Sequence, residues 1–282
     1  MMRSKGIRSK EVYNIFALLI FIIGSLIFLL PFYWMIIAST FSDSDIYKFP
    51  PRLLPGTQFL ANVKDLLLMI PYSRNFLNSI FVASVRTLLN LFFCSLVGFA
   101  FAKYSFAGKN WLFAFILGTM MIPGQVTLVP WFIMMSWFGW VNSFKALIIP
   151  NMISAFGVFW MRQYITSTIP DELLDAARID GYGEFAIYTR IVMPLIRPGL
   201  GALGIYVFMG SWNDFMQPLI ILKEVTKYTL PVAMAALQGN LYYVRYPVLM
   251  AAATIAVVPI LIVYALANKQ FIAGLTAGSI RE

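Results

Sequence analysis

Residues Val12–Ala38 read VYNIFALLIFIIGSLIFLLPFYWMIIA, a long run without a single charged side chain. A helix needs about 20 mainly apolar residues to cross the hydrocarbon core of a bilayer. A signal peptide has a shorter apolar core, followed by a small-residue cleavage site. The length of the run therefore predicts a membrane span that is retained in the protein.

The composition of the whole chain agrees with a membrane location. Of its 282 residues, 60% are hydrophobic and 12% are charged, and the mean hydropathy is +0.79. A soluble domain carries about 25% charged residues. The missing polar surface is tolerable only where lipid replaces water around much of the protein.

Five further segments are long and apolar enough to span a bilayer: Phe76–Ala102, Trp111–Trp137, Phe144–Tyr164, Gly199–Leu222 and Pro247–Ala267. The predicted fold class is therefore an all-α polytopic membrane protein with six transmembrane helices. Pro123 and Pro130 fall within the third segment, which predicts a kink or break near Pro123–Gly124. Irregular packing and a path-lining role both explain such a break.

Six spans place both termini on the same side of the membrane. The loops on the N-terminal side contain twelve Lys and Arg residues, and the opposite loops contain eight. Cytoplasmic loops carry the excess of basic residues. Both termini are therefore predicted to be cytoplasmic.

The charged and reactive residues argue against several classes of function. The net charge is +9, but the basic residues are spread among apolar segments and form no stripe that would favour nucleic acid. The chain has no histidine and a single cysteine, Cys94. It therefore lacks the usual zinc ligand, the usual general base at neutral pH and any internal disulfide. We expect no metal site and no catalytic set, which makes a membrane enzyme an unfavourable interpretation.

The predicted cytoplasmic loop between the fourth and fifth spans is unusually acidic. Ser167–Asp180 contains four of the chain's twelve acids, namely Asp171, Glu172, Asp175 and Asp180. Thr168-Ile169-Pro170-Asp171 favours a helix start with a capping box. The helix should run through Ile179 and stop at Gly181-Tyr182-Gly183.

Small residues lie four apart on that helix, at Ala177 and Gly181, with Ala176 adjacent. Side chains of this size would let another surface approach the backbone closely. Glu184–Ile191 is predicted to form a second short helix ended by Pro194.

A plainer interpretation of the same loop is a solvated amphipathic segment. In that case Asp175 merely pairs with Arg178, three residues further along the helix, for a few tenths of a kcal/mol. The residues alone leave the two interpretations open.

The spacing of the loop resembles a family signature. Asp175-Ala176-Ala177, three residues, Gly181, nine residues, Ile191, one residue and Met193-Pro194 resemble the EAA motif of ABC importer permeases. The run Ile169–Gly181 is most similar to the carbohydrate-uptake, MalG-like branch. Three further stretches resemble that branch: Trp212-Asn213-Asp214-Phe215, Thr229-Leu230-Pro231-Val232 and the tail Gly274–Gly278. The resemblance covers most of the chain.

The resemblance implies a type I ABC importer permease core at residues 76–267, with a coupling loop at 167–198. Residues 1–75 would supply an N-terminal tail, the first span and an external loop, and 268–282 a cytoplasmic tail. It implies a permease subunit in the bacterial inner membrane that carries a sugar or oligosaccharide. The implied partners are a MalF-like second permease, a cytoplasmic ATPase dimer that binds ATP and Mg, an extracytoplasmic solute-binding protein and membrane lipid.

In this family the loop inserts as a coupling helix into a cleft on the ATPase, where its acid meets a basic residue. By this resemblance, the residues of the chain expected to dock to the ATPase are Asp171, Glu172, Asp175, Ala176, Ala177, Asp180, Gly181, Ile191 and Pro194. Two departures from the motif stand out. Asp175 replaces Glu and shortens the acidic arm by one methylene, whereas Met193 replaces Leu with little change of volume.

The chain itself has no phosphate-binding loop of the G-x-x-x-x-G-K-[ST] type. Gly108-Lys109 is the nearest match, but Lys103 and Asn110 break the pattern. The energy for transport must therefore come from elsewhere, which agrees with a separate ATPase. An ion-coupled secondary transporter is the alternative; it would need titratable acids in the membrane and usually an inverted repeat. Asp214 is the clear acid of this kind, and no repeat is visible.

Two charges fall within predicted spans, Arg86 in the second and Asp214 in the fifth. Charges in the bilayer are costly and face a cavity or a partner. For Arg86 we favour a structural ion pair or a helix-interface role; for Asp214 a structural role and a pathway role remain open. Sugar sites combine aromatic faces with hydroxyl-binding polar groups. The candidate pathway residues on this basis are Trp212, Asn213, Asp214, Gln217, Gln125 and Asn151.

Overall fold

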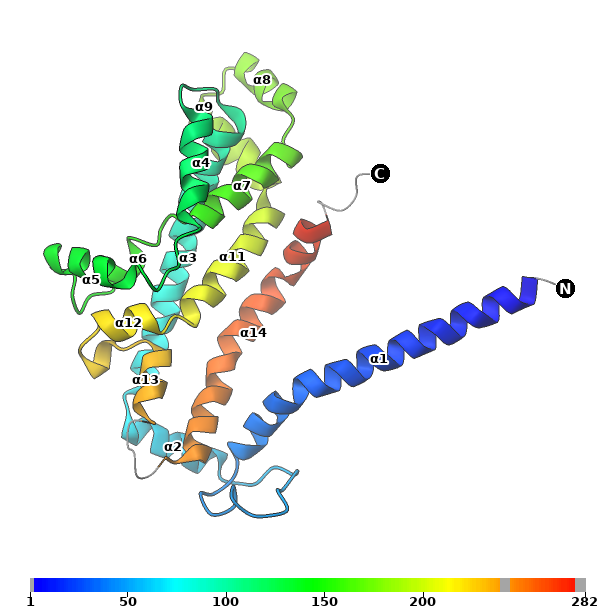
Figure 1. Ribbon diagram of the computed structural model, residues 1–282, viewed down its shortest axis with the longest axis vertical. Helices are drawn as coiled ribbons and strands as arrows, with labels where there is room; N and C mark the ends of the chain where they lie inside the picture. The colour runs from blue at the N-terminus through cyan, green and yellow to red at the C-terminus, as the bar shows by residue number, and fades with distance from the viewer. Residues whose placement is uncertain (1–2, 239–243, 277–282) are drawn as a thin grey trace. The chain divides into compact units, whose positions relative to one another are not determined.

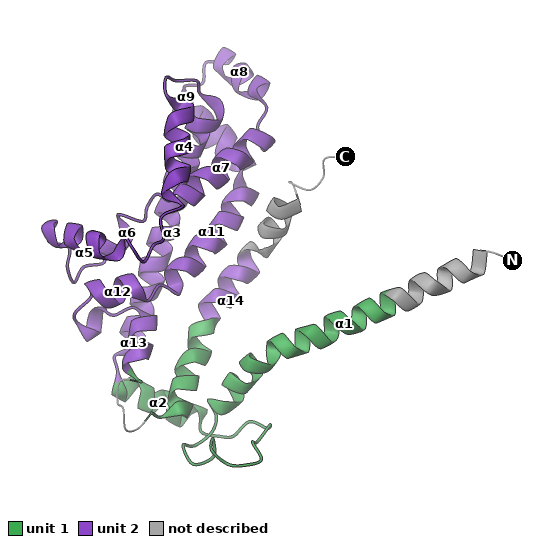
Figure 2. Ribbon diagram, in the orientation of Figure 1, with its two compact units in different colours: residues 1–69, 237–257 green, residues 70–236, 258–282 purple. Residues whose placement is uncertain are grey.

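The computed structural model describes residues 3–238 and 244–276, and these form helices, turns and loops without any strand. The predicted all-α class is confirmed. The chain divides into two compact units, residues 1–69 with 237–257 and residues 70–236 with 258–282 (Figure 2). Each unit is described separately below.

Unit 1 (residues 1–69 and 237–257) contains α1 (Arg3–Ala38), α2 (Phe59–Met69) and the first part of α14 (Tyr246–Thr276). Most apolar side chains of α1 between Ile15 and Ile36 are exposed, as expected for a helix surrounded by lipid. Arg245 holds the loop after α1 by donating to Asp43 at 2.8 Å and to Asp65, on α2, at 2.7 Å.

Unit 2 (residues 70–236 and 258–282) is built around three packed helices: α3 (Tyr72–Lys103), α7 (Ala155–Thr168) and α11 (Arg197–Trp212) (Figure 1). Gly157 allows α7 to lie close to α3. A Cβ there would come within 2.7 Å of the Cys94 sulfur and 3.1 Å of Asn90 Oδ1. Asn90 and Ser154 join the two helices through an Nδ2–Oγ hydrogen bond of 3.3 Å, and the Cys94 thiol is fully buried beside them.

The smaller elements of unit 2 surround these three helices. They are α4 (Lys109–Thr119), α5 (Leu128–Trp137), α6 (Lys145–Ile148), α8 (Asp171–Ile179), α9 (Glu184–Ile187), a π-helix (Tyr188–Val192), α10 (Met193–Leu195), α12 (Met216–Ile221), a 3-10 turn (Val225–Lys227) and α13 (Leu230–Ala236). The 3-10 turn is fixed to α3 because the Asn75 and Asn78 amides donate to two of its backbone carbonyls and to that of Tyr228, which follows it, at 2.8–3.1 Å.

The predicted number of six transmembrane helices is not confirmed in the described part of the chain. Three helical segments are long and apolar enough to cross a membrane by themselves: Asn14–Ala38, Tyr72–Lys103 and Tyr246–Leu266. A fourth crossing is possible if Glu184–Leu195 and Arg197–Trp212, which meet at 79°, act as one bent span.

The other predicted spans are interrupted. The third divides into α4 and α5 around the predicted break at Pro123–Gly124, which is confirmed. The fourth divides into α6 and α7, with Pro150 in the break between them. The fifth divides into α11 and α12 at Asn213–Phe215. The break in the fourth segment contains Pro150, which has no N–H to donate to a helix hydrogen bond. At the break in the fifth segment, Asp214 Oδ1 accepts from the Gln217 backbone N–H, and this hydrogen bond starts a new helical turn.

Candidate functional site

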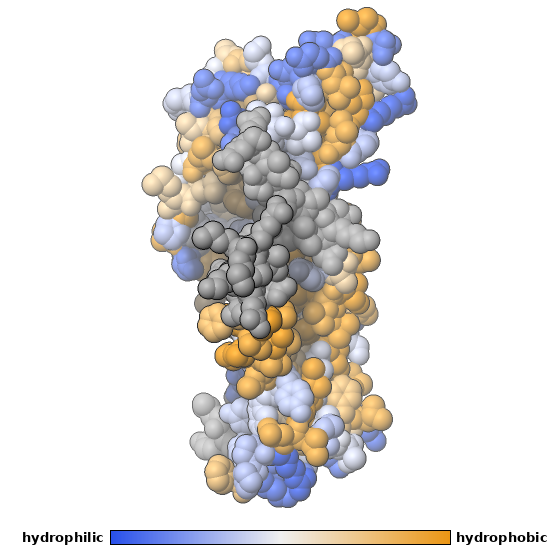
Figure 3. Space-filling view, turned by 90° about the vertical axis from the view of Figure 1, so that its right-hand side faces the viewer, coloured by the Kyte–Doolittle hydropathy of each residue, from blue (hydrophilic) through white to orange (hydrophobic). Residues whose placement is uncertain are grey.

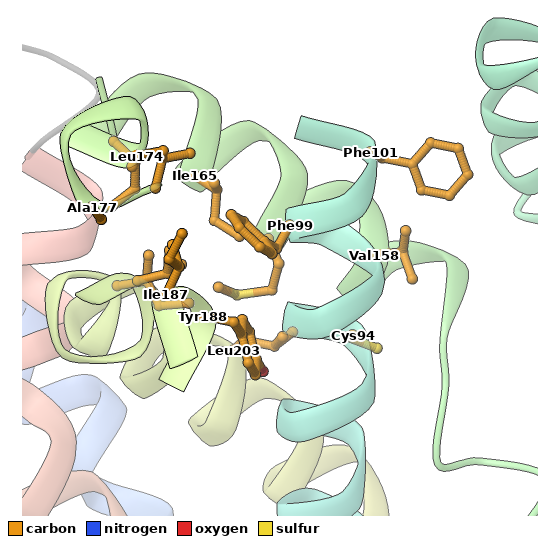
Figure 4. Packing of buried hydrophobic residues seen from close by; sticks show 14 of the residues in the cluster. Cys94, Phe99, Phe101, Val158, Ile165, Leu174, Ala177, Ile187, Tyr188 and Leu203 are labelled. Carbon is orange, nitrogen blue, oxygen red and sulfur yellow. The ribbon is translucent and has the colours of Figure 1, made fainter. Parts of the chain in front are cut away.

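Helix α8 of the predicted coupling loop is anchored to unit 2 by two side chains. Leu174 is 1% exposed and Ala177 is 4% exposed, and both join the main hydrophobic cluster of this unit. Figure 4 shows them pointing toward Ile165 and Ile187. A spacing of three residues places them on one face of the helix, so that the opposite face is left exposed.

The start of α8 differs from the predicted capping box. Thr168 is the last residue of α7. Pro170 occupies the N-cap position of α8, and no side chain there accepts a capping hydrogen bond. Asp171 instead accepts from the Lys103 ammonium at 2.6 Å, and this ion pair holds the pKa of the Asp171 carboxyl below its usual range. The capping prediction is wrong because a lysine from α3 binds the carboxylate.

The end of α8 confirms the prediction. The helix stops at Ile179, and Gly181 has φ of 82°, the left-handed conformation that glycine adopts without strain. The Tyr182 N–H donates to the Ala177 carbonyl and the Gly181 N–H donates to the Arg178 carbonyl, both at 3.0 Å. These two bonds form a Schellman motif that satisfies the last carbonyls of the helix.

Arg178 joins α8 to α9. Its guanidinium donates to Asp175 at 2.8 Å and to Glu184 at 2.8 and 3.3 Å. Arg178 lowers the pKa of the Glu184 carboxyl, and the Tyr104 hydroxyl, which also donates to Glu184, lowers it further. Burial, followed by the hydrogen bond to Glu184, raises the pKa of Tyr104 to about 12. The plainer interpretation correctly anticipated the pairing of Asp175 with Arg178.

The second short helix extends further than predicted. Helix α9 passes into a π-helix at Tyr188–Val192 and then into α10, so the chain remains helical beyond Pro194. Pro194 lies in the first turn of α10, where a missing N–H is tolerated. Ile191 is half-buried and packs against the main hydrophobic cluster.

The small side chain of Ala177 faces the core of unit 2, so the expectation that it leaves room for an outside surface is wrong. What the loop exposes instead is a mixed surface. Acidic Asp171, Glu172, Asp175 and Asp180 are exposed, as is Ala176. Ile179 is 87% exposed and Phe185 64% exposed. Figure 3 shows hydrophobic and hydrophilic residues side by side at the end of unit 2 that carries α8.

Sequence reasoning missed Ile179 and Phe185. The available signal was the helix period, because Ile179 lies two residues from buried Ala177 and therefore on the other side of α8. We call Asp175, Ala176, Ile179 and Phe185 the loop's exposed face.

A second candidate site is a polar cavity of about 550 Å³ in unit 2, between α3, α7 and α11. Its polar lining includes Arg86, Asn90, Asn151, Ser154 and Asn213, and its aromatic lining Phe156 and Tyr206. We call this space the polar cavity. Ligand sites of this size combine apolar walls with a few placed polar groups.

An ion pair lies at this cavity. The Arg86 Nη1 and Asp214 Oδ2 atoms are 3.2 Å apart, and the two side chains are 19% and 18% exposed. The two residues are 128 positions apart in sequence. The favoured interpretation of Arg86 as a member of an ion pair agrees with this contact.

The candidate pathway residues divide into two groups. Asn151 and Asn213 line the polar cavity, and Gln217 accepts from the Asn151 amide at 3.1 Å. Trp212 instead lies in the interior, where its ring stacks on Phe208. Gln125 is exposed in the turn between α4 and α5 and does not line the cavity.

Asn90, Phe156 and Tyr206 line the cavity but were not anticipated. Asn90 lies four residues after Arg86 and Tyr206 seven residues before Asn213, which places each pair on one helix face. That periodicity was the signal in the sequence.

The chain matches the family of binding-protein-dependent transport system inner membrane components over residues 94–276. The chain belongs to this family of importer permeases. The permease is 33% identical to the arabinooligosaccharides transport system permease protein AraQ of Bacillus subtilis, over 96% of its own length and 97% of that protein. It is 30% identical to the sn-glycerol-3-phosphate transport system permease protein UgpE of Salmonella typhi, over 95% and 98%.

The fold of the permease is also that of a solved transporter subunit. It superposes with a TM-score of 0.83 on a chain of a bacterial ABC transporter involved in the import of the acidic polysaccharide alginate. The match covers 94% of the permease and 98% of that chain, at 22% identity. The permease is thus an inner-membrane subunit of an ABC importer that depends on a binding protein.

Proposed function

We propose that the permease forms, with a second and different permease, the membrane pathway for a sugar or oligosaccharide. A separate ATPase dimer, which binds ATP and Mg, drives transport through the loop that contains α8 and α9. Both termini and this loop lie on the cytoplasmic side. The similarity to AraQ, an arabinooligosaccharides transport system permease, supports a saccharide cargo.

One observation carries the coupling role, namely that α8 is firmly attached on one face and exposed on the other. Leu174 and Ala177 pack into the cluster formed with α3, α7 and α11. The ion pair of Lys103 with Asp171 connects the start of α8 to α3, and the ion pair of Arg178 with Glu184 connects the end of α8 to α9. A displacement of the exposed face is therefore passed to the helices that surround the polar cavity, because packed cores shift as rigid elements.

The exposed face offers two kinds of contact to an ATPase cleft. Ile179 and Phe185 present apolar side chains, and Asp175 presents a carboxylate that is 66% exposed. Asp175 is bound to Arg178 at 2.8 Å, so a basic residue of the ATPase would share or replace that contact. The remaining docking candidates, Glu172, Asp180, Gly181 and Pro194, are exposed in the same loop.

The experiment that tests this proposal reverses the charge at Asp175. Asp175→Lys should abolish uptake and prevent co-purification of the ATPase, while the permease still inserts in the membrane. The matched control is Glu224→Lys, because Glu224 also pairs with a cation three residues away, Lys227, and is exposed to a similar extent. The control should retain the ATPase.

Uptake that survives both Asp175→Lys and deletion of residues 176–181 would refute the coupling role. If such uptake also stops when an uncoupler is added at constant ATP, an ion-coupled secondary transporter would be the better interpretation.

A further inference from the structure

The polar cavity carries no uncompensated charge. Of the lining residues that the structure describes, Arg86 is the charged one, and the Asp214 carboxylate lies 3.2 Å from it. Both side chains are less than one-fifth exposed, which limits screening by solvent. An anionic ligand in the cavity would therefore meet a guanidinium whose charge is already compensated by the Asp214 carboxylate.

The same cavity has hydrogen-bonding groups that remain available. Arg86 uses Nη1 for Asp214, and its other N–H groups make no hydrogen bond to described residues. Asn213 donates its Nδ2 to the Met209 carbonyl at 2.9 Å, whereas its Oδ1 accepts from no described residue. These groups provide donors and an acceptor without adding net charge, which suits hydroxyl groups.

An aromatic wall completes the cavity. The rings of Phe156 and Tyr206 lie 4.7 Å apart, and Tyr206 is 59% exposed. An aromatic ring offers an apolar face together with a polar tip. A sugar ring has the matching character, since its C–H face is apolar and its edge carries hydroxyls.

We propose that the polar cavity is a saccharide subsite on this chain, and that the Arg86–Asp214 pair makes it selective for uncharged sugars. Tyr206 provides the stacking face, and Arg86 and Asn213 bind hydroxyl groups. Asp214 neutralises Arg86 so that acidic sugars and phosphate esters gain no attraction. This inference rests on the proposed transport function and specifies its substrate class.

The test uses the complete transporter, with its second permease and ATPase, in nanodiscs and without the binding protein. Arabinotriose is the neutral probe, and the aldonic acid made by oxidising its reducing end is the anionic probe. Saturation-transfer NMR titrations at low salt give an apparent Kd for each. The wild type should bind arabinotriose about tenfold or more tightly than the aldonate.

Two variants identify the residues responsible. Asp214→Asn leaves the Arg86 charge without its partner and should reduce the preference for the neutral sugar to about threefold or less. Tyr206→Ala should weaken arabinotriose binding about tenfold, in line with the loss of one stacked ring. The control is Tyr264→Ala, which removes a similarly exposed aromatic side chain outside the cavity and should leave both affinities unchanged.

Equal binding of both probes by the wild type, or tighter binding of the aldonate, would overturn the inference. An unchanged preference in folded Asp214→Asn would also overturn it. If Asp214→Asn does not fold, the wild-type preference and the Tyr206→Ala comparison decide. The transport proposal is judged separately, by assembly of the complex, by stimulation of its ATPase with loaded binding protein and by the Asp175→Lys experiment above.

Discussion

Two Arg–Asp pairs in unit 2 use the same chemistry in different surroundings. Arg178 and Asp175, in the coupling loop, are 2.8 Å apart with side chains 38% and 66% exposed. Arg86 and Asp214, at the polar cavity, are 3.2 Å apart but only 19% and 18% exposed. Breaking the shorter contact should cost less free energy, because water and salt compete for exposed charges. Burial, more than distance, should therefore set the cost of breaking such a pair.

The largest effect should come from the buried pair. Asp214→Leu leaves the Arg86 guanidinium without a partner and should lower the free energy of unfolding by about 3–5 kcal/mol. Denaturant unfolding of the purified permease in detergent measures this change. The double variant Arg86→Met/Asp214→Leu removes both charges and should recover most of the loss. A double variant as unstable as Asp214→Leu would contradict this account.

The next effect contrasts the two faces of α8. Leu174→Ala should cost about 2–5 kcal/mol of stability, because Leu174 is buried in the core cluster. Ile179→Ala removes a comparable side chain from the exposed face and should change stability by about 0.5 kcal/mol or less. Association with the ATPase should respond to Ile179→Ala instead. The same unfolding assay and a pull-down with the ATPase distinguish the two outcomes.

A smaller effect is expected at the end of α8. Gly181→Ala forces a side chain into the left-handed region and should cost about 1–2 kcal/mol. Gly183 lies two residues further and has φ of −71°, so Gly183→Ala is the matched control and should be nearly neutral. Equal losses from both substitutions would show that φ is not the cause.

The exposed pair should give a small effect that depends on salt. Arg178→Ala should cost about 1 kcal/mol or less, and the loss should shrink as ionic strength rises. A double-mutant cycle with Asp175→Ala isolates the pair. A coupling energy as large as that of Arg86 with Asp214, or one insensitive to salt, would remove the distinction between the two regions.

The smallest effect concerns acid pH. The carboxyl pKa values of Asp171 and Glu184 are lowered by Lys103 and Arg178 respectively. A lowered pKa in the folded state means that these contacts stabilise the loop above the ordinary carboxyl pKa and are lost as pH falls through the lowered value. The hydrogen-exchange protection factors of the α8 amides, corrected for the intrinsic exchange rate at each pH, should therefore fall in acid before those of the α3 amides do. A simultaneous loss of protection in both helices would contradict the prediction.

The sequence anticipated features that depend on neighbouring residues. The end of α8 at Gly181 follows from local turn chemistry, and the break near Pro123 follows from the missing proline N–H. Features that depend on distant residues were not predictable in this way. Lys103 binds Asp171 from 68 positions away, and nothing near Thr168 indicates that a lysine replaces its capping role.

The same limit explains the spans and the cavity. Hydropathy identifies apolar segments, but whether a segment is one helix or two depends on which neighbours satisfy the freed backbone groups. The polar cavity requires Arg86, Asn151 and Asn213 to come together from α3, the turn before α7 and the end of α11. Each residue could be identified as polar within an apolar region, but its partners could not.

The close packing of α3 against α7 has a kinetic consequence. Cys94, the single thiol of the chain, is fully buried where Gly157 brings the two helices together. A small maleimide can alkylate it only when these helices separate. The labelling rate of Cys94 in the unmodified permease therefore reports how often the two helices separate. Comparing this rate with and without ATP would show whether ATP changes that motion, and no engineered cysteine is needed.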